Sequence, residues 1–300
     1  MWLPRFTCPE CRERVVDEGA GGLTCARCGL RFDRRCGVYR FLTPRRAEAA
    51  APFLQQYRLV REREGYRLAA GEYYRRLPAV VRGDRHAMEW RLRSESYAHL
   101  QRQALPLWRG AICVLDLGAG SGWLSHRLAA AGHNVVAVDE LDDETDGLGA
   151  CRHYTVPFAA VQADFDALPF EPAQFDLAVF GGSLHYSPDP ASTLAEAKRM
   201  LAPGGAIAVM DSPMFVREQD GRAMVEDQRR CMRSEHGLTH VVRPGAGFLT
   251  FAALENATAS LGLHGRCFPS RGPLGWRLSR QLARLQLGRA PAAFGVWFAQ

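Results

Sequence analysis

Three short apolar runs near the middle of the chain constrain its fold more than any other feature. They read ICVLDL, NVVAVD and AAVQAD, and each carries an aspartate at or beside its end, at Asp116, Asp139 and Asp164. Segments of helical pattern separate the runs, notably residues 121–132. Strands that alternate with helices predict a parallel sheet with helices on both faces.

Four more apolar runs complete the predicted sheet: FDLAVFGG, GGAIAVMD, HGRCF and FGVWFA. A helix is expected over residues 189–205, with Asp189 as its N-cap and Gly204 as its stop. We therefore expect an α/β fold whose Rossmann-like, mostly parallel sheet has seven strands and spans residues 111–300.

Two regions precede this predicted domain. Residues 44–110 show apolar spacing near 3.6, which predicts two or three helices that form a linker or a lid. Residues 1–43 are rich in Cys, Gly and Arg. We expect three parts, at 1–43, 44–110 and 111–300.

Composition limits the class of protein. The 300 residues are 47% hydrophobic and 23% charged, as in soluble globular chains. No apolar run approaches the roughly 18 residues of a membrane span, and the start has no signal-peptide core, so we expect a cytoplasmic protein without a membrane span. The net charge of +6 permits an acidic partner but does not require one.

The glycine-rich loop VLDLGAGSGW decides between ligands. Gly118, Gly120 and Gly122 are spaced G-x-G-x-G, whereas a dinucleotide fingerprint would place its third glycine where Trp123 stands. A phosphate-binding P-loop would need Gly-Lys-Ser/Thr, which the loop lacks. A pyrophosphate is therefore not the favoured ligand.

The three strand-end acids outline a different ligand. Asp116 would repel a phosphate and suits an amino group or a cation. Asp139 follows Gly118 by 21 residues, where an acid accepts hydrogen bonds from a free ribose. Asp164 is placed to reach an adenine amine. S-adenosylmethionine (SAM) combines all three features.

In order and spacing, the motifs of residues 112–211 resemble those of class I SAM-dependent methyltransferases, type 11-like. The resemblance implies a loop that cradles the methionine part of SAM, acids that hold the ribose, a border for the adenine, and an opening toward the sulfonium. By this resemblance the loop residues around the methionine part would be Asp116, Gly118, Gly120, Ser121 and Gly122. Asp139 and Glu140 would hold the ribose, and Asp164 and Phe165 would border the adenine. Gly181 and Gly182 would form the opening toward the sulfonium.

Two C-x2-C pairs, CPEC and CARC, lie in the first 28 residues. Each pair can direct two thiolates at one tetrahedral zinc, which makes Cys8, Cys11, Cys25 and Cys28 the predicted ligands. A closed set of four thiolates leaves no open position, so we expect a structural zinc in a small ribbon. Cys36 exceeds the set, and we expect it to be a small buried residue.

A zinc ribbon before a methyltransferase resembles the bacterial large-subunit rRNA guanine methyltransferases, in which the ribbon helps to grip RNA. The motif GGSLHYSPDP is instead similar to small-molecule methyltransferases of the quinone and sterol type. We prefer a small organic acceptor. The alternatives are an rRNA or tRNA base, and a catalytically silent SAM-binding or docking protein.

His185 and Tyr186 follow the fourth strand and are the candidate catalytic residues. A general base is needed only if the acceptor must lose a proton, and His185 suits that role. Packing is the alternative role for His185, and Tyr186 is alternatively a pocket wall. The acceptor atom and the oligomeric state stay open.

Two further segments carry expectations. The acidic run DELDDETDG is expected to be a solvated loop beyond Asp139. Residues 273–289 place Leu278, Leu282 and Leu285 on one helical face. We expect an ordinary packed helix there rather than one that rests on a membrane surface.

Overall fold

The computed structural model describes residues 2–19, 22–66, 71–79 and 83–300. The strands are β1 (Val15–Gly19), β2 (Gly22–Cys25), β3 (Arg31–Arg35), β4 (Val38–Arg40), β5 (Cys113–Leu117), β6 (Asn134–Asp139), β7 (Ala159–Gln162), β8 (Phe175–Gly181), β9 (Leu201–Met210), β10 (Met214–Phe215), β11 (Leu249–Thr250), β12 (Gly265–Pro269) and β13 (Gly295–Ala299). The α-helices are α1 (Pro44–Arg63), α2 (Gly71–Arg76), α3 (Ala87–His99), α4 (Trp123–Ala130), α5 (Pro190–Met200), α6 (Glu218–His236), α7 (Phe251–Ser260) and α8 (Leu274–Leu287).

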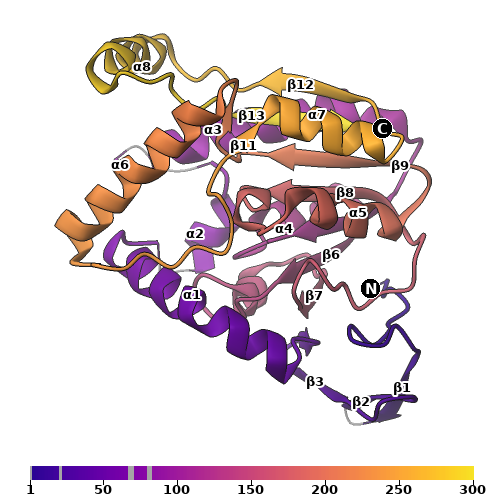
Figure 1. Cartoon of the computed structure of the whole chain (residues 1–300). Coiled ribbons are helices and arrows are strands. Elements are labelled where there is room, and N and C mark those ends of the chain that lie inside the picture. Colours follow the sequence, from indigo (N-terminus) through magenta and orange to yellow (C-terminus); the bar gives the residue numbers. More distant parts are fainter. Residues whose placement is uncertain (1, 20–21, 67–70, 80–82) are drawn as a thin grey trace.

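The seven predicted strands are present, in the order β7-β6-β5-β8-β9-β13-β12. Strands β5 to β9 pair in parallel, and β13 is antiparallel to both of its neighbours. The expected α/β class with a mostly parallel sheet is confirmed (Figure 1). Successive strands are added on one side of β5 (β6, then β7) and afterwards on its other side (β8, then β9), so the strand order reverses between β5 and β8 and the carboxyl ends of the strands flank a crevice at that point.

Alternate side chains of the buried strands face two separate cores. Leu115 packs in one core with Leu194 of α5 and Leu254 of α7. Val114 packs in the other core with Leu128 of α4. Because both faces of β5 are covered, it reads as a continuous apolar run.

The predicted count of seven strands is wrong, because the N-terminal region extends the sheet. Within the described residues, β1 to β4 add to it and eleven strands form one sheet. The junction is a parallel pairing of β4 with β7, in which Val38 lies opposite Ala160 and Arg40 opposite Gln162. Without this pairing β7 would be an open edge with unpaired backbone groups.

The helix expected over residues 189–205 is shorter than predicted. Asp189 does cap α5, since its carboxylate accepts a hydrogen bond from the Ala191 backbone N–H at 3.1 Å. The helix ends at Met200, and β9 begins at Leu201, opposite Phe175 of β8. Strand pairing therefore overrides the helical pattern before it reaches Gly204.

Cys36 is exposed, not buried as predicted. It forms the two-residue turn between β3 and β4 together with Gly37, and their φ angles are 52° and 85°. Two positive φ angles at this place are typical of the hairpin turn that matches strand twist.

The expectation of a packed helix over residues 273–289 is also wrong. Helix α8 stands out from the body at the upper left of Figure 1. The side chains of Leu278, Leu282 and Leu285 are 66%, 63% and 81% exposed. None of the described helices has both the length and the apolar character that crossing a bilayer requires.

Candidate functional site

The glycine loop after β5 needs glycine for two different reasons. Gly118, Gly120 and Gly122 have φ angles of 71°, 54° and 77°, which side chains rarely adopt. A Cβ atom on Gly118 would lie 2.2 Å from the Cβ of Ser183, and one on Gly122 would lie 2.7 Å from the ring of Phe158. At Gly120 no described atom lies within 4 Å of that position, so its Cα faces open space.

That open space is a cavity of about 490 Å³ at the carboxyl ends of the strands. Its volume lies in the range of small-molecule sites. We call it the first cavity. The predicted cofactor residues that line it are Gly118, Gly120, Ser121, Asp139, Glu140, Asp164, Phe165, Gly181 and Gly182.

Asp139 joins the glycine loop to the end of β6. Its carboxylate accepts hydrogen bonds from the backbone N–H groups of Gly120 and Leu141, both at 2.8 Å. Burial raises the pKa of Asp139 to about 6, although these two N–H groups act to lower it. Burial and the charges of Asp164 and Asp139 raise the pKa of Glu140 to about 8. Such acids favour a cationic ligand, since a positive charge nearby stabilises their ionised forms.

Asp116 occupies a different position from the one expected of an amine ligand. It is buried at 1% exposure and is absent from the described residues that line the first cavity. Its carboxylate accepts a hydrogen bond of 2.7 Å from the hydroxyl of Ser125 on α4. Burial raises the pKa of Asp116 to about 7. The structure thus places Asp116 beneath the loop, and Gly122 likewise supports the turn rather than lining the cavity.

The predicted adenine border lies at the end of β7. The Asp164 carboxylate forms an ion pair of 2.5 Å with the Arg46 guanidinium of α1. It also accepts a hydrogen bond of 2.8 Å from the Asp166 backbone N–H. Phe165 packs edge-on against Phe180 of β8. Asp164 therefore both lines the first cavity and holds α1 to the sheet.

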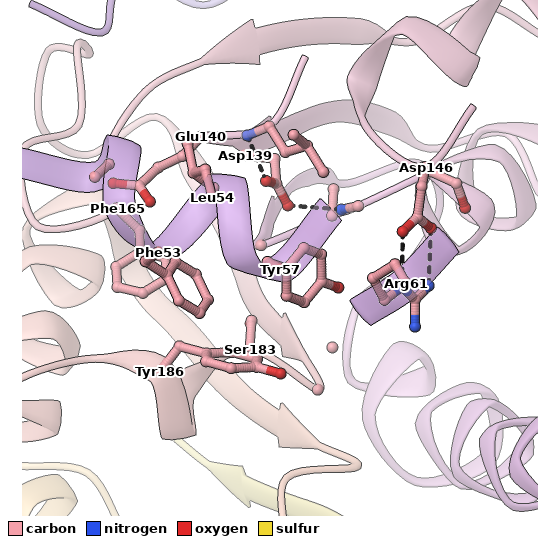
Figure 2. Close-up of a pocket in the computed structure, with 18 of the residues that line it drawn as sticks. Phe53, Leu54, Tyr57, Arg61, Asp139, Glu140, Asp146, Phe165, Ser183 and Tyr186 are labelled. Atoms are coloured by element: carbon pink, nitrogen blue, oxygen red, sulfur yellow. Dashed lines mark hydrogen bonds and ion pairs between the residues drawn. The ribbon is translucent and has the colours of Figure 1, made fainter. Parts of the chain in front are cut away.

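Helix α1 supplies a wall that the sequence analysis did not assign to particular residues. Phe53, Tyr57 and Arg61 recur at every fourth position and face the same cavity (Figure 2). The Phe53 and Tyr57 rings lie 5.4 and 6.2 Å from the ring of Tyr186, measured between centroids. The i, i+4, i+8 spacing was the available signal, since such residues share one face of a helix.

Arg61 shows that the acidic run after β6 is not simply a solvated loop. Its guanidinium forms two hydrogen bonds, of 2.7 and 2.8 Å, with the carboxylate of Asp146, which is 8% exposed. The guanidinium also lies over the Tyr57 and Tyr66 rings, 5.6 and 3.4 Å from their centroids. The expectation of a solvated loop is therefore wrong at Asp146.

A second cavity of about 510 Å³ adjoins the first. Gly182 and Tyr186 line both cavities, and so do Tyr57 and Arg61 from α1. Much of the wall that belongs to the second cavity alone is apolar, supplied by Val60, Met88, Leu92, Pro213, Met232, Val241 and Phe294.

His185 lines the second cavity, and its Nδ1 atom lies 3.2 Å from the Ser212 hydroxyl. Burial, helped by the nearby Arg243 charge, lowers the pKa of His185 to about 3. The imidazole is therefore neutral at pH 7 and accepts a proton only weakly. The catalytic roles of His185 and Tyr186 stay predictions.

Arg243 is a site residue that sequence reasoning missed. It lines both cavities, donates a hydrogen bond of 2.9 Å to the Gln228 side chain, and has no carboxylate partner among the described residues. Burial lowers its pKa. The sequence around Arg243 carries no motif, so nothing in it distinguished this arginine from the others.

The four predicted metal ligands meet at one point. The Sγ atoms of Cys8, Cys11, Cys25 and Cys28 all lie within 4.8 Å of one another. Three of the separations are 3.6 Å for Cys8–Cys28, 3.4 Å for Cys11–Cys25 and 3.8 Å for Cys11–Cys28. Thiolates about 2.3 Å from a tetrahedral zinc lie roughly 3.8 Å apart, so the cluster fits this ion.

Several arginines between this cluster and the first cavity are neutralised by acids. The ion pairs there are Arg5–Glu171, Arg12–Glu196, Arg40–Asp142, Arg45–Glu10 and Arg46–Asp164. Paired guanidinium groups offer little net charge to a phosphate backbone.

Comparison with known proteins agrees with the geometry. Residues 115–209 match the family model described as a methyltransferase domain. The malonyl-[acyl-carrier protein] O-methyltransferase of Hahella chejuensis is 28% identical over 177 residues, which cover 58% of this chain and 56% of that protein. The enzyme of the same name from Pseudescherichia vulneris is 34% identical over 123 residues, which cover 38% of this chain and 47% of that protein. The chain spans about half the length of these curated relatives.

Among solved structures, the 1,6-didemethyltoxoflavin-N1-methyltransferase of Burkholderia thailandensis is similar, with a TM-score of 0.48 and 16% identity. The match covers 95% of this chain and 97% of that chain. The magnesium protoporphyrin IX methyltransferase of Synechocystis PCC 6803 has a TM-score of 0.49 and 12% identity. That match covers 82% of this chain and 94% of that chain. The family match and the curated relatives agree that residues 115–209 are similar to methyltransferase domains.

Proposed function

We propose that this chain transfers a methyl group from SAM to a small organic acceptor. One observation carries the proposal: the two cavities meet at Gly182 and Tyr186, at the end of β8. The first cavity is lined by the glycine loop and the strand-end acids, and the second by apolar side chains together with charged ones such as Glu89, Asp211 and Arg243. A cofactor in one and an acceptor in the other would face each other at that junction.

In this proposal Asp139 and Glu140 hold the ribose, Asp164 and Phe165 border the adenine, and the loop from Gly118 to Ser121 approaches the methionine part. Bound SAM would supply an already activated methyl group. Positioning then accounts for much of the rate, because methyl transfer is an in-line displacement. Tyr57 and Tyr186 exclude water from the junction, and Arg61 fixes α1 over it.

The acceptor would enter the second cavity beside His185. Two relatives are named as O-methyltransferases of malonyl-acyl-carrier protein, so an oxygen acceptor is consistent with the comparisons. Arg243 would orient an acceptor that carries negative charge, since a buried guanidinium gains from such a partner. His185, neutral in this surrounding, would accept a hydrogen bond from the acceptor.

We further propose that the four cysteines hold one structural zinc. Bound zinc would tie the two C-x2-C turns together and leave no coordination position for substrate. The sulfur separations of 3.4–3.8 Å support this assignment.

The test of the activity is transfer of labelled methyl from SAM to host extracts separated into RNA and small-molecule fractions. We expect label in the small-molecule fraction with wild type and none with Asp139→Ala. Label in the RNA fraction alone would replace the proposed acceptor with a nucleic acid. Tight SAM binding without label in any fraction would favour a silent binding protein.

A further inference from the structure

Helix α8 turns its apolar face away from the protein. Leu274, Leu278, Leu282 and Leu285 are 72%, 66%, 63% and 81% exposed. At about 100° per residue these four leucines share an arc of roughly 80°. They therefore form one continuous stripe along the helix, which we call the leucine stripe.

The opposite face of α8 is the one that rests on the protein. Trp276, Arg280 and Ala283 are half-buried, whereas every other residue from Leu274 to Leu287 is exposed. The Arg280 guanidinium lies 4.2 Å from the centroid of the Trp276 ring and 5.5 Å from that of Phe294, and it donates a hydrogen bond to the Ala292 carbonyl. A surface helix ordinarily places its apolar stripe inward. Here specific contacts of the polar face fix the reverse orientation.

The charged residues of α8 itself are all basic, and Asp227 of α6 pairs with Arg289 just beyond the end of the helix. Six arginines and no acidic residue follow Glu255 in the sequence, at positions 266, 271, 277, 280, 284 and 289. Arg277 and Arg284 are exposed and flank the stripe on one side, about 100–120° from its centre. The exposed side of α8 is thus apolar in the middle and cationic on one flank.

We propose that α8 seats the protein on an anionic membrane surface. The leucine stripe would enter the boundary between head groups and acyl chains, while Arg277 and Arg284 contact lipid phosphates. Fourteen residues with three arginines are too short and too charged to span a bilayer, so the helix would lie in the plane of the surface.

Charge complementarity selects this partner over a second copy of the chain. Two leucine stripes packed face to face would bring the flanking arginines of both helices to one interface. The helix has no acid of its own to pair with them. An anionic lipid surface supplies both the apolar layer and the negative charge. The inference stands apart from the proposed methyl transfer, because no residue of the leucine stripe lines either cavity.

The test is flotation of the full-length protein with vesicles of phosphatidylcholine alone and of phosphatidylcholine with phosphatidylglycerol. One variant combines Leu278→Ser, Leu282→Ser and Leu285→Ser, and a second combines Arg277→Gln and Arg284→Gln. The matched controls are Val216→Ser, at an apolar residue that is 82% exposed outside α8, and Arg222→Gln on α6, whose side chain is 74% exposed.

We expect wild type and both controls to float with the anionic vesicles. Each α8 variant should bind them at least about tenfold more weakly, because each removes one of the two contributions. Melting temperature and SAM affinity should be unchanged in all variants, which separates this result from loss of the fold or of the proposed function.

Three outcomes would overturn the proposal. Wild type that ignores anionic vesicles contradicts it, and so does a leucine variant that floats as well as wild type. A leucine-dependent dimer in analytical ultracentrifugation, without vesicle binding, would assign the stripe to a second copy.

Discussion

The four-cysteine cluster and the first cavity are built in opposite ways. The cluster takes its four side chains from 21 consecutive positions, from Cys8 to Cys28, and two short turns bring them together. The first cavity takes its walls from residues as far apart as Arg45 and Pro244. A metal cluster of this kind is a local motif, whereas the cavity exists only after distant segments have packed. This difference explains why residue spacing predicts all of the four-cysteine cluster but only part of the first cavity.

The region that carries the four cysteines is nevertheless joined to the main sheet at the sheet edge. Strand β4 pairs with β7, and Phe41 is 1% exposed and lies against the ring of Phe6, 5.0 Å away between centroids. The ribbon is therefore a local motif whose last strand belongs to the main sheet. The following predictions test how far this local character extends.

The largest effect should come from Cys8→Ser. Loss of one of four thiolate ligands should lower zinc affinity by more than about a hundredfold, since even changes beyond the ligands themselves weaken metal sites 10- to 100-fold. Zinc content by mass spectrometry should fall from one per chain to near zero. Cys36→Ser is the matched control, because that thiol is exposed and outside the cluster. Unchanged zinc content in Cys8→Ser would remove the proposed ligand set.

Asp139→Ala should weaken SAM binding by at least about a hundredfold, because a buried ribose would lose two charge-assisted hydrogen bonds. Calorimetry measures the affinity, and Asp142→Ala serves as control, since Asp142 pairs with Arg40 and is not among the described residues lining the first cavity. An affinity near that of wild type would refute the placement of the ribose. Zinc content should be unaffected, which separates the two sites.

Arg61→Gln tests whether the first cavity needs α1 as well as the strand ends. The variant leaves the buried Asp146 carboxylate without its bidentate partner. We expect a lower melting temperature and about a tenfold loss of SAM affinity, as α1 loosens over the cavity. Arg63→Gln, at an exposed position on the same helix, should leave the affinity unchanged. Equal affinities for both variants would show that the strand ends suffice.

The smallest effect on SAM binding should come from Asp116→Asn, because Asp116 supports the loop from below. Its main effect should be on stability. The pKa of Asp116 is raised to about 7 in the folded protein, so the folded state holds the proton more tightly than the unfolded state. That stabilisation is present at low pH and is lost as the pH rises toward 7. An amide cannot ionise, so the variant should gain about 4 kcal/mol of stability relative to wild type between pH 4 and pH 8.

Urea denaturation at several pH values measures this difference. A flat difference across that range would show that the Asp116 carboxyl group has an ordinary pKa. A large loss of SAM affinity in the same variant would restore Asp116 as a direct contact of the methionine amine.

The parts of the fold that follow periodic patterns were predicted correctly. The seven predicted strands, β5 to β9 with β12 and β13, appear where their apolar runs lie, and most predicted cofactor residues line one cavity. The errors fall where a distant partner decides the outcome. The end of α5 depends on strand pairing with Phe175, and the burial of Asp146 depends on Arg61, 85 positions away. Cys36 is the exception, because its exposure follows from a local hairpin turn.

By itself, the sequence determined the strands, the glycine loop and the four-cysteine cluster, because periodicity, backbone conformation and ligand spacing act between near neighbours. The tertiary structure alone decided that β4 closes the edge of the sheet, that α1 covers the first cavity, and that Asp116 lies beneath the loop. It also decided that α8 faces outward, since the amphipathic pattern fixes which residues share a face but not which face meets the protein.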